Sequence, residues 1–220
     1  MPILAKKEII SCLKEGKIIF EPNLDQYQLQ PHSVDLRLGC SFYIPKKWKI
    51  SEKGRVAINF DYLDDKIQQD NFDLIKLKLG QYFEILPGEF IVASSLEKII
   101  LKDEQIMATL NARSSFLRRG LFIASGTVDV KYQGMLTFPI INNTDTQIIK
   151  LYPGERICHL TFETLTSSVS DEEAKMHGLK EAKYLESTPY GLESRVDDKE
   201  EISLIKEGKI EDLKDKYKIN

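Results

Sequence analysis

The stretch RSSFLRRGLFIASGTVDVKYQG spans residues 113–134 and combines an arginine–serine cluster, a run of small residues and a carboxylate. The cluster consists of Arg113, Ser114, Ser115 and Arg118. A guanidinium group can bind a phosphate through two parallel hydrogen bonds, and neighbouring hydroxyl groups add further short donors. The cluster therefore predicts a site for a polyphosphate group.

The second half of this stretch predicts a site for the rest of a nucleotide. Ser125, Gly126 and Thr127 are small, so a flat base can approach the backbone of a hairpin there. Asp129 follows and has two interpretations, a base that activates water or a turn residue that bonds its own backbone. Tyr132 also has two interpretations, since its ring can pack on the sugar of the ligand or in the core of the protein. We expect a nucleoside triphosphate as the ligand.

The segments around this stretch predict a mainly β fold. Short apolar runs recur at regular spacing, with turn residues such as Leu86-Pro87-Gly88-Glu89 between them. This pattern is typical of an all-β barrel or sandwich. Alternation of apolar and polar residues predicts a half-buried strand at 33–44 as well. The other expected strands are KIIFEP at 17–22 and 73–79, 82–86, 89–95, 97–101, 105–111, 121–124, 127–130, 134–142, 147–151 and 156–163.

The two ends of the chain differ from this β pattern. Residues 5–15 predict an amphipathic helix that stops at Gly16. Residues 166–197 are polar and predict an extended tail, whereas 198–220 are charged and predict one or two short helices. We therefore expect a domain at 1–165, a covering tail at 166–197 and a helical extension at 198–220. Within the domain, residues 46–72 are polar and predict a long excursion.

Composition excludes several classes of function. The chain has 220 residues, 42% of them hydrophobic, and a formal net charge of −3, so no global positive field attracts nucleic acid. The N-terminus does not resemble a signal peptide and no apolar run reaches membrane-spanning length. Three widely spaced cysteines give neither a disulfide framework nor a zinc site, and the zinc-deaminase motif is absent. We expect a cytoplasmic protein with no zinc, no nucleic-acid partner and no membrane.

Several motifs in order resemble the dCTP deaminase/dUTPase family. RSSFLRRGL resembles the arginine–serine motif of both branches, and GTVDVKYQG at 126–134 resembles the aspartate motif of dUTPases. PHSVDLRLG at 31–39 and GERICHLTFE at 154–163 are similar to the first and fourth motifs. The predicted helix at 5–15 and the segment AKY at 182–184 in the tail resemble the corresponding segments of the deaminase branch of the family. The resemblance covers roughly residues 5–197.

This resemblance implies a fold, an assembly and a set of site residues. The fold would be a distorted, jelly-roll-like barrel of the dUTPase (β-clip) type with an N-terminal helix and a helical C-terminal extension. The assembly would be a homotrimer with sites between subunits, and Mg²⁺ would arrive bound to the triphosphate, with Asp35 acting there only indirectly. For Asp35 the residues themselves favour a structural role, orienting Arg37 or a backbone turn. The implied catalytic residues are Asp129, Ser114 and Arg118, and the implied substrate contacts are Arg113, Ser115, Ser125, Gly126, Thr127, Tyr132, Arg156, His159, Lys183 and Tyr184.

One departure from the family pattern decides between the activities at this stage. Deaminases of the family carry a proton-shuttling glutamate five residues after the glycine that corresponds to Gly134, and this chain has Pro139 there. Proline has no ionisable group. The sequence therefore favours a dUTP diphosphatase, which hydrolyses dUTP to dUMP and diphosphate. The alternatives are a metal-free dCTP deaminase that forms dUTP and ammonia, and a nucleotide-binding regulator with little turnover.

Overall fold

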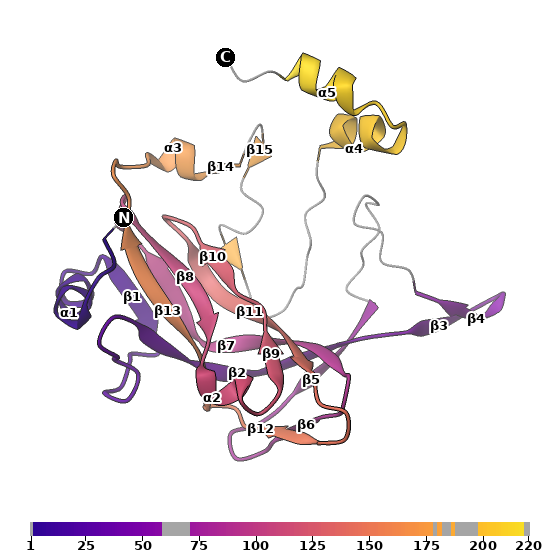
Figure 1. Ribbon diagram of the computed structural model, residues 1–220, viewed down its shortest axis with the longest axis horizontal. Coiled ribbons are helices and arrows are strands. Elements are labelled where there is room, and N and C mark those ends of the chain that lie inside the picture. Colours follow the sequence, from indigo (N-terminus) through magenta and orange to yellow (C-terminus); the bar gives the residue numbers. More distant parts are fainter. Residues whose placement is uncertain (1, 59–70, 178–179, 182–185, 188–197, 218–220) are drawn as a thin grey trace.

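The core of the protein is a curled, mainly antiparallel sheet of ten strands that forms half of a barrel (Figure 1). It is seen in a computed structural model that describes residues 2–58, 71–177, 180–181, 186–187 and 198–217. The main path of neighbouring strands is β10-β8-β13-β2-β7-β11-β16, and β1, β5 and β9 pair at its sides. The predicted mainly β, barrel-like fold is confirmed.

The elements have the following bounds. The longer strands are β1 (Ile18–Glu21), β2 (Val34–Pro45), β5 (Phe72–Lys76), β7 (Phe90–Leu101), β8 (Ile106–Ala112), β11 (Gln133–Asn142) and β13 (Arg156–Thr164). The shorter ones are β3 (Trp48–Ser51), β4 (Gly54–Ala57), β6 (Phe83–Ile85), β9 (Leu121–Ile123), β10 (Gly126–Val128), β12 (Ile149–Leu151), β14 (Met176–His177), β15 (Lys180–Glu181) and β16 (Glu186–Ser187). The helices are α1 (Lys6–Lys14), α2 (Ser114–Leu117), α3 (Asp171–Ala174), α4 (Lys199–Lys206) and α5 (Ile210–Lys216).

Alternating side chains of the central strands fill the core. Val34, Leu36 and Leu38 of β2 are fully buried, as the period-two pattern predicts. Phe42 continues this strand and stacks on Phe83 of β6 with ring centroids 4.8 Å apart. These side chains hold β2 in the middle of the sheet, so the polar side chains that β2 carries between them occupy defined positions.

A close approach of two backbones fixes β2 against β7. A Cβ atom on Gly39 would lie 2.5 Å from both the Ser94 Oγ and the Ser95 carbonyl oxygen. Only glycine leaves room for this contact. The pairing of β2 with β7 is irregular between Leu38 and Phe42, where this approach occurs.

The register of three adjacent strands brings distant parts of the sequence together. Asp35 of β2 lies opposite His159 of β13, and His159 lies opposite Asn111 of β8. Arg113 follows the end of β8, and its backbone N–H donates to the Ile157 carbonyl oxygen at 3.2 Å. The motifs predicted from the sequence at 31–39, 113–121 and 154–163 therefore meet at one place on the sheet.

Three details of the predicted strands are corrected. The separate strands expected at 89–95 and 97–101 form one strand, β7, because no turn separates them. The excursion expected at 46–72 includes a regular hairpin, β3–β4, which projects from the sheet in Figure 1. A proline within a strand predicts a sheet edge or a bulge there. Pro139 lies on no edge, since β11 pairs with β7 on one side and with β9 on the other, and the irregularity of this strand lies between Met135 and Thr137.

The helices lie at the two ends of the chain and at one strand end. α1 buries Ile9 and Cys12, and the chain turns at Gly16, where φ is +70°. α4 and α5 pack against each other beside the sheet rather than on it (Figure 1). The predicted N-terminal helix and the helical C-terminal extension are confirmed, whereas the division into three parts remains a prediction.

Candidate functional site

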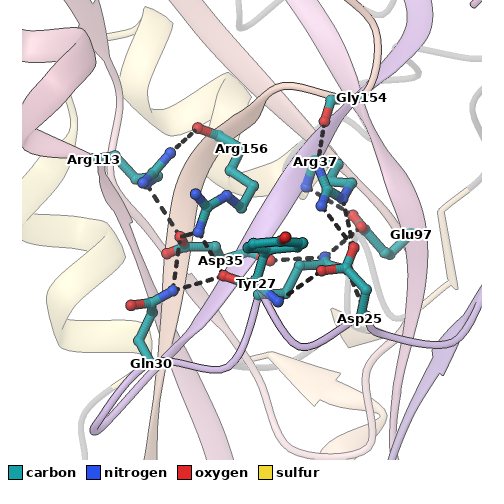
Figure 2. A network of polar contacts seen from close by, with 10 residues as sticks. Asp25, Tyr27, Gln30, Asp35, Arg37, Glu97, Arg113, Gly154 and Arg156 are labelled. Carbon is teal, nitrogen blue, oxygen red and sulfur yellow. Dashed lines mark hydrogen bonds and ion pairs between the residues drawn. The ribbon is translucent and has the colours of Figure 1, made fainter.

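Asp35 is the buried centre of a side-chain cluster that joins three of the sequence motifs (Figure 2). Its Oδ2 atom lies 3.2 Å from Arg113 Nε and 3.1 Å from Arg156 Nη1. Gln30 Nε2 donates to the same oxygen at 3.3 Å. The Asp35 side chain is 4% exposed, whereas each arginine side chain is 27% exposed. The cluster therefore presents two guanidinium groups to solvent over a buried carboxylate.

Further bonds fix both guanidinium groups. Arg113 Nη1 donates to the Arg156 carbonyl oxygen at 2.7 Å, and Arg156 Nη1 donates to the Tyr27 carbonyl oxygen. Burial raises the pKa of the Asp35 carboxyl, although the charges of Arg113 and Arg156 act to lower it. Once ionised, Asp35 cancels only one of the two positive charges, so the cluster keeps one net positive charge. Such a cluster can bind an anion.

A second arginine–carboxylate pair lies beside the first in Figure 2. Arg37 binds Asp25 Oδ2 with an Nη2–Oδ2 distance of 2.6 Å, and its Nη1 donates to the Gly154 carbonyl oxygen at 2.6 Å. The sequence left open whether Asp35 orients Arg37, and the structure assigns that contact to Asp25. Asp35 contacts Arg113 and Arg156 instead, because the registers of β2, β13 and β8 place their side chains in one row.

Glu97 on β7 connects these pairs to the core. It is 1% exposed and accepts from Gln28 Nε2 at 2.7 Å and from the Arg37 backbone N–H at 3.0 Å. Burial raises the pKa of the Glu97 carboxyl, against the lowering effect of these hydrogen bonds. Because Gln28 lies next to Tyr27 in the sequence, Glu97 fixes the loop whose carbonyl group holds Arg156. Sequence patterns did not select Glu97, because it lies within an apolar run.

His159 is half-buried in the same row of side chains. Burial lowers the pKa of its imidazole, while the Asp35 charge acts to raise it. It lies opposite Asp35 on β13, beside the two arginines in the strand register. Its predicted role as a substrate contact remains a prediction.

The remaining members of the arginine–serine cluster lie at the surface. α2 begins directly after Arg113, and Ser114, Ser115 and Arg118 are exposed on and just after it. Phe116 anchors the helix in the core with 2% exposure. The two hydroxyls and the Arg118 guanidinium are therefore available to a ligand at the surface next to the Asp35 cluster.

The small-residue hairpin and Asp129 form a different part of the surface. Ser125, Gly126, Thr127 and Asp129 are all exposed, between β9 and the turn after β10. Tyr132 is 7% exposed and belongs to the hydrophobic core, and its hydroxyl donates to the Met135 carbonyl oxygen at 3.1 Å. Of the two interpretations of Tyr132 that the sequence allowed, the structure supports the core residue.

Within a single copy of the chain, Asp129 lies far from the cluster of Arg113, Arg156 and Asp35. Val128 of β10 pairs with Ala108 of β8, and Asp129 follows it. Arg113 lies five residues after Ala108, directly past the end of β8, which corresponds to roughly 16 Å of extended chain. The two halves of the predicted site thus lie toward opposite ends of the same strand.

The tail contributes one residue that sequence reasoning missed. His177 Nε2 of β14 lies 3.4 Å from Asp129 Oδ2. No spacing or motif could have indicated this pair, because the two residues are distant in the sequence and belong to different segments. Lys183 and Tyr184, the predicted contacts of the tail, lie outside the described residues.

The described residues contain neither a further metal-binding cluster nor a membrane-spanning helix. No group of three or more histidine, cysteine, aspartate or glutamate side chains in this part of the chain is arranged to hold a metal ion. Among the helices of the same residues, none has the length and apolar character needed to cross a membrane.

The curled sheet and the cluster around Asp35 define a mainly β protein with a cationic site at its surface. The particular family follows from the sequence: the chain belongs to the dCTP deaminase-like family, whose model matches residues 3–165. The family expected from the motifs is therefore confirmed.

Curated relatives cover most of the chain. The chain is similar to a protein of Methanosphaera stadtmanae named "dCTP deaminase, dUMP-forming", with 35% identity over 190 residues, which are 86% of this chain and 91% of the relative. A protein of Dictyoglomus turgidum with the same name is 36% identical over 181 residues, which are 81% of this chain and 88% of that one. A solved dCTP deaminase of Agrobacterium tumefaciens has the same fold, with a TM-score of 0.56 and 24% identity over 79% of this chain. The present chain spans half the length of that solved chain.

These relatives correct the activity that the sequence favoured. Their names state dCTP deamination with dUMP as product, so dUTP hydrolysis as the main activity, and with it the class of dUTP hydrolase, is wrong. The deaminase alternative is the better interpretation, with dUMP rather than dUTP as the named product. The error came from letting Pro139 alone outweigh the opening helix and the AKY segment, which are similar to the deaminase branch.

Proposed function

We propose that this protein converts dCTP to dUMP, with release of ammonia and diphosphate. The observation that carries the proposal is the similarity to curated relatives of that name over 91% and 88% of their lengths. The cationic cluster around Asp35 and the exposed hydroxyls of Ser114 and Ser115 support a triphosphate as the anchoring group of the substrate. We place the reaction in the cytoplasm, where nucleotide metabolism takes place.

The proposed roles of the site residues follow from their chemistry. Arg113 and Arg156, with Ser114, Ser115 and Arg118, hold the phosphates, and magnesium comes bound to the triphosphate. The exposed hairpin of Ser125, Gly126 and Thr127 accepts the base at its backbone. Asp129 takes the proton of the water that attacks the α-phosphorus. His159, Lys183 and Tyr184 remain candidate substrate contacts, and Tyr132 supports the hairpin from the core.

A site built in this way requires at least two copies of the chain. The Asp129 hairpin and the arginine cluster lie toward opposite ends of β8, about five residues apart along the strand. We propose a homotrimer in which the hairpin of one copy faces the arginine cluster of the next. This arrangement also agrees with the exposure of both halves in the single chain.

Pro139 gives the proposal a specific requirement. It stands where the family resemblance implies a proton-carrying glutamate, and a proline cannot carry a proton. Proton transfer at the base must then come from water or from a side chain supplied in the assembled site. The variant Pro139→Glu is expected to raise the rate of ammonia release.

The decisive experiment follows both halves of the reaction. The protein is incubated with dCTP and, separately, with dUTP in the presence of Mg²⁺, and ammonia, diphosphate, dUTP and dUMP are measured. The proposal expects equal amounts of ammonia, diphosphate and dUMP from dCTP. Accumulation of dUTP, or normal dCTP binding with no product, would refute it.

Asp129→Asn should abolish diphosphate release and keep dCTP binding. The control is Asp145→Asn, which changes an exposed aspartate in the turn after β11 and should affect neither diphosphate release nor dCTP binding.

A mixing experiment tests the shared site. Asp129→Asn and Arg113→Gln should each be inactive alone. If one copy supplies the hairpin and another the arginine cluster, mixed assemblies of the two variants contain some sites with both wild-type halves. We expect mixing under conditions that exchange subunits to restore part of the activity. Mixtures that stay inactive although subunit exchange is demonstrated would exclude sharing between these two halves.

A further inference from the structure

The turn after β10 carries the proposed catalytic carboxylate, and the tail holds that carboxylate in place. His177 Nε2 lies 3.4 Å from Asp129 Oδ2, and both side chains are 50% exposed. The turn itself is closed by a hydrogen bond from the Tyr132 backbone N–H to the Asp129 carbonyl oxygen at 3.3 Å. Its backbone is thus fixed by local bonds, whereas the Asp129 side chain is fixed by a residue of another segment.

A second ion pair joins the same turn to the same segment. Lys131 Nζ lies 3.0 Å from Asp171 Oδ1 and 3.5 Å from Glu104 Oε1. Lys131 has a positive φ of 62°, so the turn has a narrowly defined shape. Among the described residues, the charged or titratable groups that contact one another here are Asp129 and Lys131 from the turn, Asp171 and His177 from the tail, and Glu104 from the loop before β8.

The geometry at Asp129 suits a base that is held by one oxygen. In the described part of the chain the ion pair of Asp129 uses Oδ2, which leaves Oδ1 for a water molecule. A carboxylate on an exposed turn samples several rotamers unless a partner selects one. Misplacement of a catalytic group by about 1 Å can lower a rate by about a hundredfold, so a partner that selects the rotamer affects turnover directly.

We propose that His177 is a positioning residue for Asp129 in the step that releases diphosphate. This inference rests on the proposed conversion of dCTP to dUMP. In that step the water oxygen forms a bond to the α-phosphorus, and the bond from this phosphorus to the oxygen that bridges to the β-phosphate breaks. Diphosphate leaves with the electron pair of that bond. The proton of the water passes to Asp129 Oδ1, while His177 holds Oδ2.

The test compares three variants of the full-length protein. His177→Ala removes the contact, His177→Gln keeps an N–H donor without a charge, and Asp171→Asn weakens the other ion pair between the turn and the tail. We expect His177→Ala to lower kcat for diphosphate release by about ten- to a hundredfold with little change in KM. His177→Gln should recover much of this loss, and Asp171→Asn should leave kcat within about twofold of the wild type.

The outcomes separate the two proposals. If the wild type forms no dUMP from dCTP, the proposed function fails, and the positioning role fails with it. If the wild type forms dUMP and His177→Ala is as active, only the positioning role is overturned. Equal losses in His177→Ala and Asp171→Asn would also overturn it, because they would show that docking of the tail matters rather than the rotamer of Asp129.

Discussion

Replacing Glu97 by alanine is expected to weaken both the fold and the candidate site. The Glu97 carboxylate is 1% exposed and accepts two hydrogen bonds, from Gln28 Nε2 at 2.7 Å and from the Arg37 backbone N–H at 3.0 Å. Glu97→Ala leaves the Arg37 backbone N–H and one of the two Gln28 Nε2 hydrogens without an acceptor, while Gln28 Nε2 keeps its bond to the Asp35 carbonyl oxygen at 2.9 Å. Each unsatisfied buried donor costs about 1–3 kcal/mol, so the free energy of unfolding should fall by about 3–5 kcal/mol.

This loss is large enough to measure by thermal unfolding. For a chain of this size each kcal/mol lowers the melting temperature by about 2–4 °C, so the variant should melt roughly 10 °C below the wild type. The matched control is Glu84→Ala, which removes a carboxylate that is 45% exposed and 3.6 Å from Lys150. An exposed ion pair contributes about 0.5 kcal/mol, so this control should shift the melting temperature by about 2 °C at most.

The same variant tests the connection between the buried network and the site. Gln28 is held by Glu97, and the neighbouring Tyr27 carbonyl group accepts from Arg156. Glu97→Ala should therefore also weaken dCTP binding, measured by calorimetry at a temperature where the variant is folded. A variant that melts within about 2 °C of the wild type would refute the reasoning, since it would mean that water or a rearranged loop satisfies both donors.

Three further predictions concern two glycines and the pH dependence of stability. Gly39→Ala places a Cβ atom 2.5 Å from the Ser95 carbonyl oxygen, so it should lower the free energy of unfolding in urea by about 3 kcal/mol. Gly126→Ala meets no atom within 4 Å, so its melting temperature should not change, while dCTP affinity measured by calorimetry should fall about tenfold if the hairpin accepts the base. Burial raises the pKa of Glu97, so the folded chain keeps a proton there that the unfolded chain has lost above about pH 4. The stability of the wild type relative to Glu97→Gln, measured by urea unfolding, should therefore fall as pH rises above the ordinary glutamate pKa of about 4, and an increase would contradict the raised pKa.

The main strands could be predicted because their pattern is local. Alternation in β2 follows directly from residues 34–38, which place every second side chain in the core. Turn residues marked most strand ends as well. The unbroken strand β7 could not be predicted from the expected strands at 89–95 and 97–101, because the burial of Glu97 depends on Gln28, which lies far away in the sequence.

The candidate site was predicted by residue type but not by arrangement. Arg113 was selected for its chemistry and Arg156 through the family resemblance, and the register of β8 and β13 brings them to one carboxylate. Side-chain spacing along the sequence contains no information about that register. For the same reason the contact of His177 with Asp129 could not be predicted, and the burial of Tyr132 could not be distinguished from exposure.

The activity was predicted wrongly for a different reason. A single position, Pro139, was weighed as a chemical requirement, although the relatives that match most of the chain are named as deaminases. A missing side chain shows which group does not carry a proton. It does not show which reaction the rest of the site performs.

The unequal charges around Asp35 affect the choice of buffer for any study of this protein. Two guanidinium groups share one carboxylate, so the empty cluster attracts small anions from solution. Phosphate or sulfate at the concentrations of ordinary buffers should therefore compete with the triphosphate of the proposed substrate, dCTP, and raise its apparent KM. A phosphate-free buffer of low ionic strength is therefore the condition in which weak substrates and partly active variants can be compared on equal terms.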